Sequence, residues 1–120
     1  MVRVEADVGR NRLLIVVRGS PSGDRLDEVL RDLEAALVRL RPPIDILSDV
    51  RELEELGPHL VDGFKTIGVR LHRFGVRRSV RIVGKSAKAA VTMERFARHL
   101  KNHAAHLAFS EAEAEAAFLK

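Results

Sequence analysis

The chain has 120 residues, no cysteine and a formal net charge of +4 at neutral pH. A chain of this length is expected to form one domain, residues 1–120, and to bury enough surface to fold without disulfides. The lack of cysteine excludes a disulfide framework, a zinc–thiolate site and a cysteine nucleophile. The start, MVRVEADVGR, is charged and alternating, unlike a signal peptide, and no apolar run approaches the ~20 residues of a membrane span. We therefore expect a cytoplasmic protein.

The first twenty residues predict a β-hairpin. Apolar and charged residues alternate over positions 2–8, which is typical of a strand with one solvent-exposed face. A turn at residues 9–11 follows, and then a continuous apolar run at 13–17, which ends before Gly19. The short connection makes the two strands antiparallel, and the second strand should be the more buried.

A helix and a third strand come next. Asp24 is a favourable N-cap for a helix whose apolar residues recur every three or four positions up to Leu40, just before Pro42. Residues 44–49 alternate as a half-buried strand. The residues that follow, up to the start of the second helix, are predicted to form a loop, with room for a short helical turn.

The second helix is predicted to begin at Pro58 and to end at Gly75. Its apolar residues again keep the spacing of one helix face. Gly63 and Gly68 lie inside it, where glycine costs about 1 kcal/mol relative to alanine. We attribute both glycines to close packing of this helix on the sheet.

The remaining chain continues the alternation of strands and helices. Residues 80–83 predict a strand, Ser86 caps a helix that extends to Leu100, and residues 106–109 form a short last strand. Ser110 with Glu113 is a capping box that starts a terminal helix. The order predicts an α/β fold with a mostly parallel sheet of about five strands, helices from successive βα units, and the first strand antiparallel at the edge.

The stretch from Pro42 to Gly63 is where we expect the working surface. It carries the third strand, an acidic loop and the start of the second helix. In α/β units, ligands and partners usually bind where a strand ends and the next helix begins with free N–H groups. The predicted partner-binding residues lie within positions 49–62: Asp49, Arg51, Glu52, Glu55, Pro58, His59 and Asp62.

The carboxylates of this stretch do not indicate a particular reaction. Paired carboxylates can serve acid–base chemistry or hold a divalent cation. However, no histidine, serine or lysine stands at a spacing that indicates a mechanism, although His59 is close. The loop from Gly19 to Gly23 lacks the spacing and the lysine of a P-loop. We therefore predict a non-enzymatic protein without a cofactor, in which Asp45, Asp49, Glu52, Glu54 and Glu55 form a solvent-exposed acidic rim.

One segment of the chain, residues 70–85, is concentrated in basic side chains. Within it, Arg73, Arg77, Arg78 and Arg81 form a predicted anion-binding patch for a phosphate-bearing partner or an anionic surface. The simpler interpretation is a solvated basic face, because Arg73 suits a helix C-terminus and Arg81 alternates with apolar neighbours as an outward-facing strand residue. Tryptophan and tyrosine are absent, so most of the stacking platforms of single-stranded nucleic-acid binders are missing.

Three histidines occur together in the sequence HLKNHAAH, as His99, His103 and His106. His99 and His103 would share a helix face, a spacing that permits metal coordination. No glutamate of the HExxH type lies between them, and Lys101 is adjacent. A solvated helix end is the simpler interpretation, so we assign no metal site and leave the histidine group open.

Three stretches of the chain resemble the SpoIIAA-like proteins of the STAS fold: PPIDILSDVREL, GFKTIGVRLHRFGVRRSVRIVGKS and HLAFSEAEAEAAFL. As in that family, a strand with an Asp-rich end precedes a long helix, a basic strand and another helix. The chain then closes with a phenylalanine, a few acidic residues and an alanine-rich helix. The resemblance covers nearly the whole chain, and by architecture it places the chain near lipid-binding SEC14-type domains.

The resemblance implies a regulatory or protein-interaction domain. In the anti-sigma-factor antagonists of the STAS group, a serine at the start of the helix after the central strand is phosphorylated, and this switches partner binding. A phosphate at a helix N-terminus carries enough charge to do so. The matching positions here are Gly57, Pro58 and His59, and none of them is serine. We therefore expect partner binding that is constitutive or controlled by another switch.

Two other functions stay open from the sequence. One is a small-molecule or lipid-binding module with a cleft between helices, as the kinship with SEC14-type domains implies. The other is weak nucleic-acid or anionic-surface binding through residues 70–85. An open sheet edge also favours self-association, so a homodimer is predicted. The identity of the protein partner cannot be read from the sequence.

Overall fold

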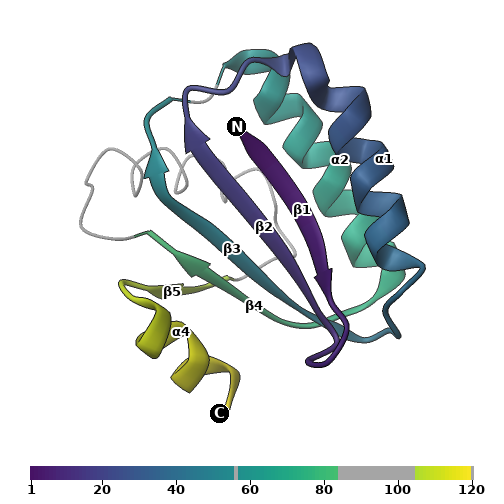
Figure 1. Ribbon diagram of the computed structural model, residues 1–120, viewed down its shortest axis with the longest axis vertical. Helices are drawn as coiled ribbons and strands as arrows, with labels where there is room; N and C mark the ends of the chain where they lie inside the picture. The colour runs from purple at the N-terminus through teal and green to yellow at the C-terminus, as the bar shows by residue number, and fades with distance from the viewer. Residues whose placement is uncertain (56, 84–104, 120) are drawn as a thin grey trace.

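The computed structural model describes residues 1–55, 57–83 and 105–119. Five strands form one sheet in the order β1-β2-β3-β4-β5 (Figure 1). β1 pairs antiparallel with β2, and the other neighbours pair in parallel, as the sequence predicts. The elements are β1 (Val2–Asp7), β2 (Arg12–Gly19), the 3-10 turn η1 (Gly23–Arg25), α1 (Leu26–Leu37), β3 (Ile44–Leu53), α2 (Pro58–Phe74), β4 (Val76–Ile82), β5 (His106–Ala108) and α4 (Glu111–Phe118).

The predicted hairpin at the sheet edge is confirmed. Its register runs from the Val2–Val17 pair to the Asp7–Arg12 pair. Asn11 closes the turn with a φ of 51°, a left-handed conformation that asparagine tolerates well. Its backbone N–H donates to the carbonyl oxygen of Val8 at 3.2 Å.

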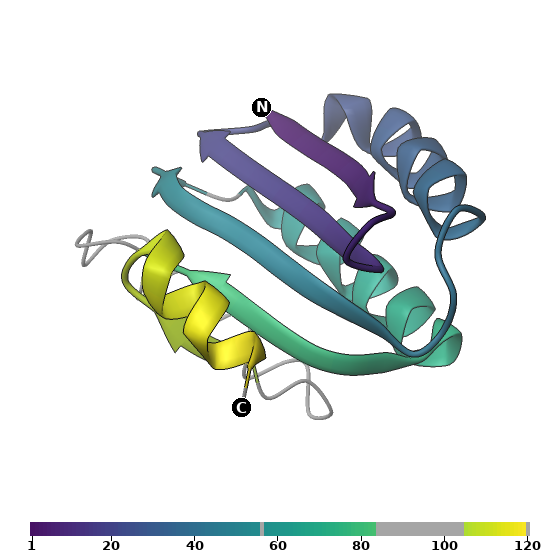
Figure 2. The same ribbon diagram turned by 60° about the horizontal axis from the view of Figure 1, so that its bottom comes forward.

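α1 and α2 cover one face of the sheet, as the view in Figure 2 shows. Alternate residues of β2, namely Leu13, Ile15 and Val17, belong to the core on this face and are at most 7% exposed. The helices contribute residues such as Leu33 and Leu71 to the same core. The apolar residues at helical spacing and those that alternate along the strands therefore pack together in one apolar layer.

The opposite face of the sheet carries α4, which lies over β4 and β5 (Figures 1 and 2). A second apolar cluster joins these elements, made of Val80, Ile82, Ala108, Ala114, Ala117 and Phe118. Within the described residues, no helix covers β1 and β2 on this face. The described helices also include none that is long and apolar enough to cross a membrane.

β2, β3 and β4 are longer than the sequence predicts, and β2 extends over Arg12–Gly19 where the prediction had residues 13–17. β3 continues to Leu53, where the prediction placed a loop from residue 50. The strand continues because Val50 and Leu53 are buried in the core and because β2 still pairs with it at Gly19. β4 begins at Val76, four residues before its predicted start, since the chain pairs with β3 directly after α2.

The predicted cap of the first helix is wrong. Asp24 lies inside η1, and α1 begins only at Leu26, without a side-chain hydrogen bond to its cap residue. The helix ends at Leu37, and the chain reaches Leu40 as a turn. The other helix boundaries are confirmed: Gly75 follows α2, and the hydroxyl of Ser110 accepts a hydrogen bond from the Glu113 N–H at 3.1 Å. The predicted helix at 86–100 lies outside the described residues.

Gly63 is a glycine because α2 approaches α1 closely. A Cβ at this position would lie 2.5 Å from Cδ1 of Leu26. The sequence interpretation placed this contact on the sheet, whereas the structure places it between the two helices. A larger residue here would require the Leu26 side chain to move.

We expect Gly23→Ala to destabilise the fold by about 1–3 kcal/mol, because the new Cβ would lie 2.8 Å from Cβ of His59. Both atoms are attached directly to backbone, so either η1 or the start of α2 must move. Urea unfolding measures the loss. Gly9→Ala is the matched control, with its nearest neighbour at 3.8 Å, and should stay within about 0.5 kcal/mol of wild type. Equal losses in the two variants would contradict the close approach.

Candidate functional site

The predicted partner-binding residues lie around the carboxyl end of β3, at the strand–helix junction (residues 49–62). Asp49 and Arg51 are half-buried on β3, on the sheet face that also carries α4. Pro58, His59 and Asp62 are exposed at the start of α2, which packs on the other face. Glu52 and Glu55 are exposed between these two groups. The seven residues therefore lie on both sides of the carboxyl end of β3, the central strand.

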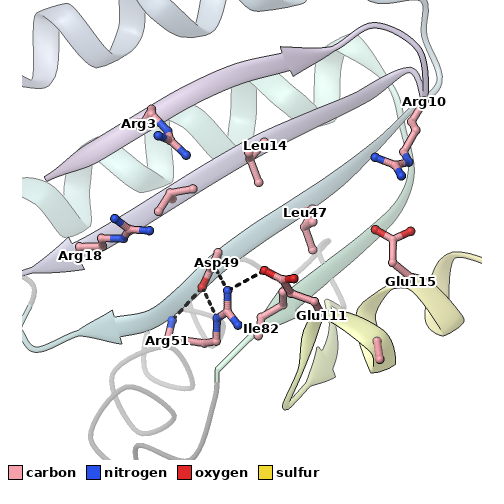
Figure 3. A pocket seen from close by; sticks show the side chains of 12 residues that line it. Arg3, Arg10, Leu14, Arg18, Leu47, Asp49, Arg51, Ile82, Glu111 and Glu115 are labelled. Carbon is pink, nitrogen blue, oxygen red and sulfur yellow. Dashed lines mark hydrogen bonds and ion pairs between the residues drawn. The ribbon is translucent and has the colours of Figure 1, made fainter.

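A β-bulge in β3 places Arg51 at this junction. Between the pairs Val16–Asp49 and Arg18–Glu52, β3 has two residues where β2 has one. A bulge of this kind re-aims a side chain at a strand end. The Nε and Nη2 of Arg51 donate to the carboxylate of Asp49 at 3.0 and 2.7 Å, and Nη2 also donates to Glu111 of α4 at 3.1 Å (Figure 3).

The pKa of Asp49 reflects this pairing. Burial acts to raise the pKa, but the hydrogen bonds from Arg51 and the charges of Arg51 and Arg18 outweigh it. The pKa of Asp49 therefore lies below its ordinary value of 3.8. Conversely, the hydrogen bond with Asp49 is the largest effect that raises the pKa of Arg51. Asp49 is an ionised, paired carboxylate at neutral pH.

A groove of about 580 Å³ continues from this pair across the open sheet face, between α4 and the β1–β2 hairpin (Figure 3). We refer to it as the sheet groove. Arginines line the hairpin side and the end of β3, carboxylates line the side of α4 and the end of β3, and apolar residues form the floor. These residues are Arg3, Arg10, Arg18 and Arg51, then Asp49, Glu111 and Glu115, and then Leu14, Val16, Leu47 and Ile82, with Ala112 beside them.

Arg12 fixes α4 beside the groove. Although it is charged, Arg12 is only 6% exposed. Its Nη1 and Nη2 donate to the two carboxylate oxygens of Glu115 at 2.7 and 3.3 Å. The guanidinium also lies over the ring of Phe118, 3.9 Å from the ring centroid, which is cation–π geometry. A buried cation thus has its counter-charge and its packing partner on the same helix.

The residues of the predicted anion-binding patch do not form one surface. Arg77, the extra residue of a bulge in β4, donates to the carboxylate of Asp45 at 2.8 and 2.6 Å. Arg78 donates to the carbonyl oxygen of Ala117, at the end of α4. Arg73 is exposed on α2. Anion binding by these residues stays a prediction.

The expected outward orientation of Arg81 is wrong. Its exposed fraction is 7%, and its Nε has no hydrogen-bond partner within the described part of the chain. Burial lowers its pKa. Strand alternation places Arg81 opposite Val80 and Ile82, but that face is not solvated at this position. Alternation identifies residues that share a face, and it does not say whether the face is exposed.

The histidine group stays undecided. His106 is exposed on β5, while His99 and His103 fall outside the described residues. Across residues 1–55, 57–83 and 105–119, no group of three or more potential metal-ligating side chains is gathered.

The sheet groove was not predicted from the sequence. Its lining comes from four strands and α4, so no local motif spans it. One signal was present: the alternation of β2 and β3 puts Leu14, Val16 and Leu47 on the face opposite the main core. Apolar residues on both faces of a strand indicate a second face that is at least partly covered.

The fold is similar to that of two solved structures. An uncharacterised protein of the DUF3478 family with a SpoIIAA-like fold, from Shewanella loihica PV-4, matches with a TM-score of 0.72 at 18% identity, over 97% of this chain and 90% of that chain. The anti-sigma factor antagonist SpoIIAA in its unphosphorylated form matches with a TM-score of 0.64 at 11% identity, over 99% of this chain and 97% of that one. No family model and no curated protein sequence matches the chain. The likeness confirms the predicted SpoIIAA-like fold.

We expect the pH dependence of stability to depend on Glu115. Its hydrogen bonds with Arg12 lower its pKa below the ordinary value of 4.5. A carboxylate with a lowered folded-state pKa contributes fully above its unfolded pKa and loses this contribution as the pH falls through the folded pKa. Glu115→Gln should therefore be less stable than wild type at pH 7, by about 1 kcal/mol because Glu115 is half exposed. The difference should shrink below pH 4.5.

Urea unfolding at a series of pH values measures this effect. The control is Asp32→Asn, which makes the same acid-to-amide change at an exposed position on α1 and is measured over the same pH series. A Glu115→Gln curve that is parallel to wild type over the whole range would show that the Arg12–Glu115 pair does not stabilise the fold.

Proposed function

We propose that this chain is a non-enzymatic regulatory domain that binds a protein partner through the strand–helix junction (residues 49–62). The observation that carries the proposal is the exposed start of α2 beside the exposed end of β3. Pro58, His59 and Asp62 project from a helix held by the core, so the surface is presented without a cost of ordering it. The likeness to the fold of an anti-sigma factor antagonist supports a regulatory role.

The position of His59 also supports a preformed surface. Gly23 of η1 approaches its Cβ so closely that no side chain would fit between them. η1 therefore holds the first turn of α2 from one side, while Leu60 anchors it in the interior at 1% exposure. A partner would meet side chains whose backbone is already fixed.

The carboxylates of the junction are better suited to recognition than to catalysis. A general acid at neutral pH needs a raised pKa, whereas the pKa of Asp49 is lowered. Glu52 pairs with Arg18 at 2.9 Å, and both side chains are at least half exposed. Exposed charge pairs contribute little stability but give a surface a defined charge pattern.

Partner binding at this surface would not depend on phosphorylation at the helix start. Gly57, Pro58 and His59 occupy the N-cap and first turn of α2, and none has a hydroxyl group. We therefore propose binding that is constitutive or controlled by a different signal.

The lipid-binding alternative receives less support. It requires an apolar cleft between helices, whereas the sheet groove lies on the open sheet face and is lined by arginines and carboxylates. Binding sites for apolar ligands are mostly apolar and bury most of the ligand.

The test is capture of the partner from the native organism with tagged protein, followed by quantitative mass spectrometry. Asp62→Lys and His59→Glu each change an exposed junction residue. A reversed or newly introduced charge in an interface costs at least about 1.4 kcal/mol of binding free energy. Each variant should therefore retain the partner at least about 10-fold less well.

Asp32→Lys is the matched control, since it makes the same substitution at an exposed position of α1. It should capture the partner as wild type does. The proposal fails if no protein is enriched over the tag alone, or if Asp62→Lys and His59→Glu retain the partner as well as Asp32→Lys.

A further inference from the structure

The sheet face that carries α4 has a raised half and a recessed half. α4 stands over β4 and β5, whereas the β1–β2 half has no covering helix among the described residues (Figure 2). The sheet groove lies at this step, and its floor contains Leu14 and Leu47, which are only half-buried. α4 has eight residues and is about 12 Å long, shorter than the strands beneath the recess. In length, α4 is therefore short enough for the recessed half.

The side chains that line the groove differ in charge between the two halves. On the recessed side, Arg3, Arg10 and Arg18 keep 48%, 62% and 50% of their side chains exposed, although each already pairs with a carboxylate of its own chain, namely Glu5, Asp7 and Glu52. On the raised side, Glu111 and Glu115 keep 76% and 47% exposed, although each already pairs with an arginine of its own chain. A carboxylate has enough lone pairs to accept from a second donor, and a guanidinium has five N–H donors, so it can bind a second carboxylate. Each side can therefore form further ion pairs.

α4 is apolar on two opposite sides. Ala114, Ala117 and Phe118 face the sheet and are buried. Ala112, Ala116 and Leu119 follow the spacing of a helix face that points the other way, and Leu119 is 88% exposed. The glutamates lie between these two sides. A helix with apolar residues on opposite sides is typical of one that is covered on both.

We propose that the chain forms a homodimer in which α4 of each copy lies in the sheet groove of the other. The open faces of the two sheets would face each other across a two-fold axis that lies between them. The outer alanines of α4 would then cover Leu14 and Leu47 of the second copy. The glutamates of α4 would meet Arg3, Arg10 and Arg18.

The charge pattern favours a second copy over a different partner. The recess and the helix that fits it lie on the same face of one chain, so a two-fold axis satisfies both at once. A different protein with an acidic helix would fill the recess but would leave the outer side of α4 uncovered. The dimer leaves the α2 part of the junction surface accessible, because Pro58, His59 and Asp62 lie at the start of a helix on the other face of the sheet, whereas Asp49 and Arg51 of the junction line the groove.

Sedimentation velocity over a range of protein concentrations tests the dimer. Wild type should approach twice the mass of one chain, and added salt should weaken the association because exposed ion pairs are screened. Arg3→Glu with Arg18→Glu should weaken the dimer at least about 10-fold, since glutamates would then face glutamates. Ala112→Lys with Ala116→Lys should do the same, by placing lysines against the arginines of the groove.

Mixing these two double variants provides the decisive result. In the mixed pair, the lysines of one α4 meet the new glutamates, and the unchanged α4 meets unchanged arginines. A heterodimer should therefore form although neither variant dimerises alone. Arg31→Glu with Arg39→Glu makes the same charge change at exposed positions of the α1 region and should leave the dimer intact.

Three results would overturn the proposal. Wild type could stay monomeric at every concentration, which would leave the recess to another molecule. Arg3→Glu with Arg18→Glu could dimerise as wild type does. The two double variants, each folded by circular dichroism, could fail to form the mixed dimer. Asp62→Lys, which tests the junction surface, should dimerise normally, so the failure of one proposal is distinguishable from the failure of the other.

Discussion

The pair between Arg12 and Glu115 is the interaction on which the second face of the sheet depends. The two residues are 103 positions apart, so the pair joins the second strand to the last described helix. Arg12 is almost completely buried, and removing a charge from water costs several kcal/mol unless an opposite charge compensates it. Glu115 supplies that charge and Phe118 supplies the packing surface. Arg51 and Arg78 then hold the two ends of α4, through Glu111 and the carbonyl oxygen of Ala117.

Local patterns of the sequence were sufficient for most of the fold. The hairpin, α2 with its stop at Gly75 and the capped start of α4 follow from alternation, spacing and cap residues within a few positions of each other. The errors occur where tertiary contacts determine the boundaries of an element. β3 continues past residue 49 because its end is buried against the core and pairs with β2. Asp24 offers a good cap, but the chain enters α1 through a 3-10 turn that packs on the start of α2.

The two candidate sites also differ in whether local sequence patterns could locate them. The strand–helix junction is continuous in the chain and could therefore be located from the sequence. The sheet groove could not, because its arginines and carboxylates come from elements that only the topology brings together. Arg81 and Arg77 make the same point: both follow a basic pattern, yet one is buried and the other pairs with Asp45. The sequence shows the charge of a segment, but it does not show which residues its side chains contact.

Topology also explains why the groove exists. Both described crossovers, β2 to β3 and β3 to β4, advance in the same direction across the sheet, and right-handed connections then place α1 and α2 on the same face. Parallel strands are usually covered on both faces, so the other face has an apolar strip that α4 covers only in part. Arginine suits the edge of such a strip, because its aliphatic stem can lie over apolar residues while the guanidinium stays in water. Arg3 and Arg18 can therefore shield the floor in a free chain and present charge to whatever molecule covers it.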